Sequence, residues 1–144
     1  MRGSRALAFT LSVLIAVVGC RTGMVIVDES FQADLVSAAH AGRTVSLHEL
    51  THFDWETVYI FQDEWSGKDI NRGVGERVMG DDDFQDEHIT LWVFKHDGRV
   101  VRAVQTGGYV VIGVPNPVVA LTNVLLVPTS SGSQLTIAGG SPIP

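Results

Sequence analysis

The chain has 144 residues and a formal charge of −6, from 16 acidic and 10 basic side chains. This length predicts one domain. The acidity argues against nucleic acid as a partner, because such binding depends on neutralising phosphates with basic side chains. The one cysteine, Cys20, excludes an intramolecular disulfide, and no motif in the chain indicates a cofactor.

The amino terminus has the pattern of a bacterial export signal. Arg2 and Arg5 precede the apolar run 6–18, and this stretch ends in Val17-Val18-Gly19-Cys20. As a helix, the run would measure about 20 Å at about 1.5 Å per residue, which is short for a hydrocarbon core of about 30 Å but typical of a signal peptide. The last four residues resemble the lipobox of bacterial lipoproteins. That resemblance implies cleavage before Cys20 and a diacylglycerol on its sulfur; the alternatives are an ordinary signal peptide and an uncleaved anchor.

We therefore divide the chain into a signal peptide (1–19), a lipid-anchored tether (20–28), one small domain (29–138) and a flexible tail (139–144). Cleavage would leave 8 basic and 16 acidic side chains. Anionic headgroups repel such a domain, so the expected membrane partner is reached through the lipid, and two or more acyl chains anchor stably. The predicted location is the bacterial cell envelope, either outside the cytoplasmic membrane or in the outer membrane facing the periplasm.

The first half of the domain carries two helix signals and one strand signal. Apolar residues at helical spacing, after capping candidates Asp28 and Ser30, predict a helix over 29–40. Residues 46–49 have the form of a capping box and predict a single helical turn. The β-branched and aromatic stretch 55–61 predicts a strand with apolar groups on both faces, hence a central one. Alternation places Trp55 on the same face as Tyr59 and Phe61.

The second half predicts a short helix, a hairpin and further strands. Ser66 as cap and glycines at 73 and 75 predict the short helix, and the acidic stretch 76–88 is interpreted as a solvated loop. Strands over 89–95 and 100–106 meet at Asp97-Gly98, a strong two-residue turn signal. We expect that turn to fix the register, with Phe94 opposite Val101, Trp92 opposite Ala103, and Leu91 opposite Val104.

The carboxyl-terminal region contains two apolar stretches, 109–114 and 118–127, separated by Pro115-Asn116-Pro117. Two prolines make one lipid-buried helix improbable, so we expect two buried strands joined by a turn, with a last strand at 134–138. The predicted fold is α+β: an antiparallel sheet of about four or five strands, one main packed helix and a short second helix.

One segment resembles a known group of proteins. The stretch 53–61, which contains Asp54-Trp55-Glu56 followed by Val58-Tyr59-Ile60-Phe61, is similar to a family of small uncharacterised bacterial lipoproteins. In that family a short helix ending in glycine follows, as in 67–75 here, and a later hairpin has a turn like Lys95-His96-Asp97-Gly98. The similarity covers about residues 44–106. It implies the fold and the envelope location and adds no reaction.

Two sets of residues are candidates for a binding site. Acidic and imidazole side chains in the 81–88 loop could hold a divalent cation, although they lack the alternating spacing of a calcium loop; these are Asp81, Asp83, Asp86 and His88. Aromatic residues Trp65, Trp55 and Tyr59 could line a ligand surface. Spacings typical of catalytic nucleophiles are absent from the sequence.

We therefore predict a lipid-anchored envelope protein that is not an enzyme and binds a protein or an envelope component. The alternatives are a small hydrolase or metal-dependent enzyme using the 81–88 loop, and a carrier of a small apolar ligand suggested by 109–127.

Overall fold

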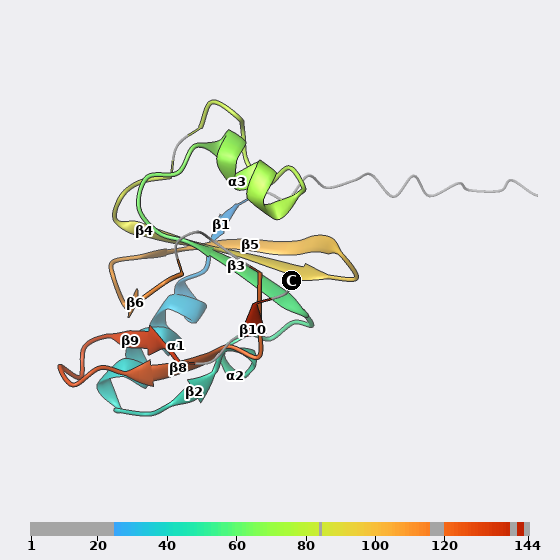
Figure 1. Ribbon diagram of the computed structural model, residues 1–144. Helices are drawn as coiled ribbons and strands as arrows, with labels where there is room; N and C mark the ends of the chain where they lie inside the picture. Colours follow the sequence, from blue (N-terminus) through green and yellow to red (C-terminus); the bar gives the residue numbers. More distant parts are fainter. Residues whose placement is uncertain (1–24, 84, 116–119, 139–140, 143–144) are drawn as a thin grey trace, which may run out of the picture.

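The computed structural model describes residues 25–83, 85–115, 120–138 and 141–142, which form two β-sheets and three helices (Figure 1). The larger sheet has the strand order β1-β5-β4-β3-β7-β10, with bounds β1 Ile26–Val27, β5 Arg99–Gly107, β4 Ile89–His96, β3 Thr57–Phe61, β7 Leu121–Thr122 and β10 Ser141–Pro142. The smaller sheet has the order β2-β8-β9-β6, with bounds β2 Val45–Ser46, β8 Leu125–Pro128, β9 Leu135–Ile137 and β6 Val111–Ile112. The helices are α1 Glu29–His40, α2 Leu47–Leu50 and α3 Gly67–Val74.

The α+β class and a largely antiparallel arrangement are confirmed, but the strands form two sheets where one was expected. The pairs β1–β5 and β6–β9 are parallel. The apolar stretches divide between the sheets, because β6 and β8 belong to the smaller one and β7 to the larger. Asn123, whose φ is 51°, interrupts the extended conformation between β7 and β8. The apolar pattern of such a strand predicts that it is buried. It does not predict which strands pair with it, because those partners come from distant segments of the chain.

Helix α1 matches the predicted bounds and lies between the two sheets. The Asp28 carboxylate accepts a hydrogen bond from the Phe31 backbone N–H, and this interaction caps the first turn. The helix contacts β5 of the larger sheet and both β8 and β9 of the smaller one. Its buried face joins the main core through Phe31 and Leu35. The predicted packing of this helix on one face of a sheet is confirmed.

Strand β3 lies between β4 and β7 and separates two hydrophobic clusters. Val58 and Ile60 belong to the main core, on the side of α1, whereas Phe61 belongs to a smaller core under α3. The prediction of a central strand is therefore confirmed. The predicted placement of Trp55 with Phe61 is wrong, because the strand begins at Thr57 and Trp55 turns into the main core.

The β4–β5 hairpin forms with the predicted turn but with a different register. Asp97 and Gly98 have φ values of 49° and 71°, as a two-residue turn of this type requires. A β-bulge at Phe94/Lys95 then shifts the pairing by one residue, so that Phe94 pairs with Arg102 and Trp92 with Val104. The same shift moves the predicted pairing of Leu91 to Gln105. Turn residues set the pairing beside the turn, and an extra residue on one strand resets it beyond that point.

Helix α3 covers the other face of the larger sheet and organises the acidic loop (Figure 1). It begins at the Ser66 cap and ends at Gly75, which has a left-handed conformation. Asn71 binds the following segment by accepting hydrogen bonds from the backbone N–H groups of Val78 and Met79. Val78 and Gln85 are buried, so the interpretation of 76–88 as a wholly solvated loop is wrong in part.

The boundaries of the domain extend beyond 29–138. Strand β1 lies within the predicted tether, and β10 lies within the predicted flexible tail and pairs with β7. The predicted last strand at 134–138 is confirmed as β9. The signal peptide, the lipobox and Cys20 lie outside the described residues.

Candidate functional site

The aromatic residues proposed as a ligand surface do not share one surface. Trp55 is 4% exposed; its indole Nε1 donates a hydrogen bond to Thr51 Oγ1, and its ring stacks on His48 with centroids 3.8 Å apart. Tyr59 and Trp65 pack against the other core, under α3. The Trp65 Nε1 donates to the Gln62 carbonyl at 2.8 Å, which holds the ring half-buried.

The residues proposed as metal ligands in the 81–88 loop do not contact one another through a shared site, and most of them have interactions of their own. Asp81 accepts a hydrogen bond from Asn71 Nδ2 at 2.8 Å, and Asp83 accepts one from the Gly80 N–H at 2.9 Å. His88 pairs with its neighbour Glu87 at 3.3 Å and contacts the Tyr109 ring. Asp86 is exposed. Within the described part of the chain, these residues do not form a convergent set of ligand atoms.

A pocket opens beside the first turn of α1. Its volume is about 190 Å³, and its lining comes from the start of α1, the segment after α2, and the paired strands β4 and β5. The lining residues are Asp28, Ser30, Phe31, Leu50, Thr51, His52, Phe53, Phe94, Arg102 and Val104. Small-molecule sites usually span about 300–1,000 Å³, so this pocket suits a small group or a single side chain. None of the described residues of the apolar stretch 109–127 lines this pocket, and two of them, Val111 and Leu126, pack into the main core.

One cation and one anion face each other in this pocket. The Arg102 guanidinium lies 3.8 Å from the Asp28 carboxylate and 4.7 Å from the centre of the Phe53 ring. The pKa of Asp28 is lowered, chiefly by the hydrogen bond from the Phe31 N–H, then by the Ser30 hydroxyl and by the charge of Arg102. The 3.8 Å between Arg102 Nη1 and Asp28 Oδ2 exceeds hydrogen-bonding distance, so this contact leaves the donors of the guanidinium available to a ligand.

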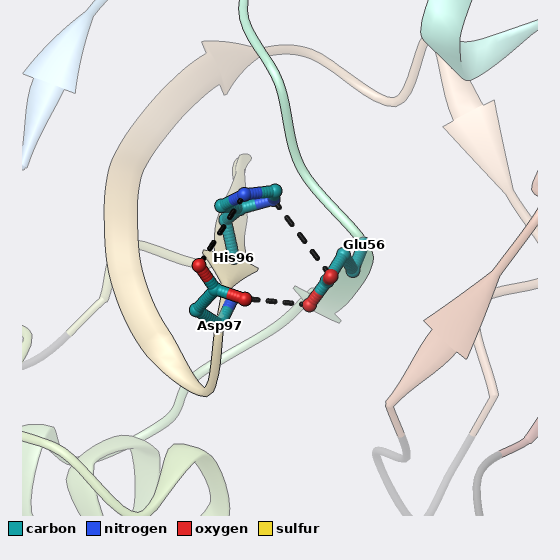
Figure 2. A group of neighbouring side chains, drawn as sticks. All are labelled: Glu56, His96 and Asp97. Atoms are coloured by element: carbon teal, nitrogen blue, oxygen red, sulfur yellow. Dashed lines mark hydrogen bonds and ion pairs between the residues drawn. The ribbon is translucent and has the colours of Figure 1, made fainter.

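A second group of polar side chains lies at the turn of the β4–β5 hairpin. Figure 2 shows Glu56, from the segment before β3, facing His96, the last residue of β4, and Asp97, which follows it in the turn. His96 Nε2 lies 3.7 Å from Asp97 Oδ2, and His96 Nδ1 lies 4.0 Å from Glu56 Oε1. One ligand atom from each residue lies within 4.8 Å of the others. Imidazole and carboxylate groups are ligands for divalent transition metals.

Backbone contacts hold this group in place. The Glu56 N–H donates to the Lys95 carbonyl at 2.8 Å, which aligns Glu56 with the end of β4. The Glu56 Oε2 accepts a hydrogen bond from the Asp97 N–H at 3.0 Å. Sequence reasoning missed the group because Glu56 is 40 positions from His96. The Asp97-Gly98 turn signal predicts that His96 lies at the end of a strand. Only the pairing of β3 with β4 brings Glu56 close to His96.

No helix among the described residues is long and apolar enough to cross a membrane. Comparisons of the chain with protein-family models, with curated proteins and with solved structures find no match.

Proposed function

We propose that the protein is a lipid-anchored component of the bacterial cell envelope that binds a partner without catalysing a reaction. The observation that carries this proposal is the order of features at the amino terminus: basic residues, the apolar run 6–18 and a lipobox-like 17–20. The single cysteine of the chain stands at the position that receives lipid in such sequences. The acidic domain has no excess of basic side chains with which to hold anionic lipids, so the lipid supplies the attachment.

This anchor would keep the domain close to the membrane. Six residue steps separate Cys20 from Ile26, where β1 begins. A fully extended chain covers at most about 3.3–3.6 Å per residue, so the domain would lie within about 20 Å of the lipid-bearing residue. Asp28 follows β1 directly and lines the pocket. The pocket therefore begins eight positions after Cys20 in the chain.

The pocket supports a binding role and indicates the chemistry of its ligand. A guanidinium recognises carboxylates and phosphates through paired N–H donors, and Arg102 presents one beside apolar ring surfaces of Phe31, Phe53 and Phe94. A small anionic group with an apolar body, on a protein or an envelope component, fits both features. The partner we propose therefore carries such a group and lies near the bilayer surface.

Labelling with radioactive palmitate and membrane fractionation test the anchor. The wild-type chain should incorporate palmitate and sediment with membranes, and Cys20→Ala should lose both properties. Thr22→Ala, two residues further along, serves as the matched control and should behave as the wild type. A wild-type chain without label, or a Cys20→Ala chain that stays with membranes, would show that the anchor is not a lipid on this cysteine.

A nuclear magnetic resonance titration with benzoate tests the pocket, because this probe joins a carboxylate to an apolar ring. Shifts should concentrate on the pocket lining, and Arg102→Gln should weaken binding by several-fold or more. Arg43→Gln removes an exposed arginine that pairs with Glu49, away from the pocket, and should leave binding unchanged. Equal weakening by both variants would mean that charge in general, and not this pocket, attracts the probe.

A further inference from the structure

The hairpin-turn group of Glu56, His96 and Asp97 carries an inference independent of the pocket and of the lipid anchor. We propose that these three side chains form a binding site for a divalent transition metal, with Zn²⁺ as the best-matched ion. The three donors are one imidazole nitrogen and two carboxylate oxygens (Figure 2). Three protein ligands and an open fourth position form a common zinc arrangement.

The distances in the group suit such an ion. Zinc lies about 2.0–2.2 Å from nitrogen and oxygen ligands, so ligands in a tetrahedral site lie about 3.4 Å apart. The ligand atoms, one from each residue, all lie within 4.8 Å of one another, so a closure of about 1.4 Å or less brings them to this spacing. The carboxylates of Glu56 and Asp97 are 54% and 86% exposed, so both can rotate inward without disturbing the core.

The environment of His96 points to a ligand. Its Nδ1 atom is shielded from solvent and has no hydrogen-bond partner, and the Glu56 Oε1 atom, 4.0 Å away, lies beyond hydrogen-bonding distance. A shielded nitrogen without a partner is costly, because burial removes its hydrogen bonds to water. A cation held between this ring and the carboxylates would make the contacts that are absent without it.

The local charges also favour a cation. Two carboxylates converge here, and the basic residues next to them in the chain are directed elsewhere. Lys95 donates from Nζ to the Val74 carbonyl at 2.9 Å, and Arg99 pairs with Glu76 at 3.7 Å, on the side of α3. In the described residues the only side-chain ion pairs of Glu56 and Asp97 are those with His96. A divalent ion would offset this negative charge.

The ligand chemistry selects among metals. Mg²⁺ and Ca²⁺ prefer six or more oxygen ligands, whereas imidazole nitrogen with carboxylate oxygen suits first-row transition metals such as Zn²⁺. The bound ion would join the hairpin turn to the start of β3, two segments that Glu56 and the Asp97 N–H already connect.

The test is a calorimetric titration of the full-length chain, purified in detergent without an affinity tag, with ZnCl₂ and separately with MgCl₂. One Zn²⁺ should bind, and MgCl₂ should not compete with it. His96→Gln and Glu56→Gln should each weaken zinc binding by at least about tenfold, since even groups that only support metal ligands typically contribute 10–100-fold. Glu56→Gln keeps an oxygen that can accept from the Asp97 N–H, so the turn should stay folded.

Two controls separate this site from others in the chain. His88→Gln removes an exposed imidazole in the 81–88 loop and should leave affinity unchanged. Cys20→Ser removes the only thiol and should also leave it unchanged. Visible absorption of bound Co²⁺, used in place of Zn²⁺, should disappear in His96→Gln and persist in His88→Gln. The proposal is overturned if no Zn²⁺ binds, or if binding survives in both His96→Gln and Glu56→Gln.

Discussion

Replacement of Asp28 tests the link between the first turn of α1 and the pocket beside it. The carboxylate accepts hydrogen bonds from the Phe31 N–H at 3.0 Å and the Ser30 hydroxyl at 2.7 Å, and it lies 3.8 Å from Arg102. Loss of an N-cap side chain costs about 0.5–2 kcal/mol, and an ion pair of moderate exposure contributes about 0.2–1 kcal/mol. Asp28→Ala should therefore lower the free energy of unfolding by about 0.7–3 kcal/mol, the sum of these two contributions.

Asp28→Asn separates the two contributions, because asparagine caps helices about as well as aspartate. This variant should lose only the charge-dependent part, about 1 kcal/mol or less. Urea denaturation followed by circular dichroism measures both variants, and the midpoint should shift without a change in slope. In a double-mutant cycle, Asp28→Asn combined with Arg102→Gln should show a coupling of a few tenths of a kcal/mol up to about 1 kcal/mol.

The pH dependence supplies an independent check. The pKa of Asp28 is lower in the folded protein than its ordinary value of 3.8, chiefly because of the hydrogen bond from the Phe31 N–H. The charge-dependent stability is therefore fully present above about pH 4 and is lost as the pH falls through the folded-state pKa. The difference between wild type and Asp28→Asn should shrink over that interval. A constant difference down to pH 2, or an Asp28→Ala effect below about 0.3 kcal/mol, would refute this account.

Three further predictions concern the core, a close contact and the turn. Leu126→Ala, at a fully buried position of β8, should cost about 2–5 kcal/mol in urea denaturation, whereas Leu125→Ala, at a position 41% exposed, should change stability by about 0.5 kcal/mol or less. Gly67→Ala should cost about 1–3 kcal/mol by thermal unfolding, because the added Cβ would overlap the Gly80 carbonyl oxygen; an unchanged melting temperature would contradict that close packing. Gly98→Ala should lower the free energy of unfolding by about 1 kcal/mol, because φ is +71° there and alanine disfavours that conformation. No atom lies within 4 Å of the added Cβ, so a larger loss in the same assay would contradict an effect of the backbone alone.

The candidate sites show where sequence reasoning reaches its limit. The 81–88 loop was a candidate metal site because its acidic residues are close together in the chain. In the structure, Asp81 accepts a hydrogen bond from the Asn71 side-chain amide and Asp83 accepts one from the Gly80 N–H. The hairpin-turn group was not predicted, because Glu56 is remote from His96 in the chain. Adjacency in sequence does not measure convergence in space, and convergence is what a ligand site requires.

Local structure was determined by the sequence alone. The start of α1, the capping box at 46–49 and the Asp97-Gly98 turn each depend on atoms a few residues apart, so short patterns were sufficient to predict them, although the structure chose Asp28 over Ser30 as the cap of α1. The same holds for the central position of the strand predicted at 55–61, whose two apolar faces require cover on both sides, although the strand begins at Thr57.

Only the tertiary structure decided the partners of these elements. The bulge at Phe94/Lys95 changed the hairpin register, the stretch 109–127 was divided between two sheets, and Trp55 turned into the main core. The pocket and the hairpin-turn group arise from the same pairings. Each of these outcomes depends on how side chains that are distant in sequence pack together in one core. No single segment of the sequence contains that information.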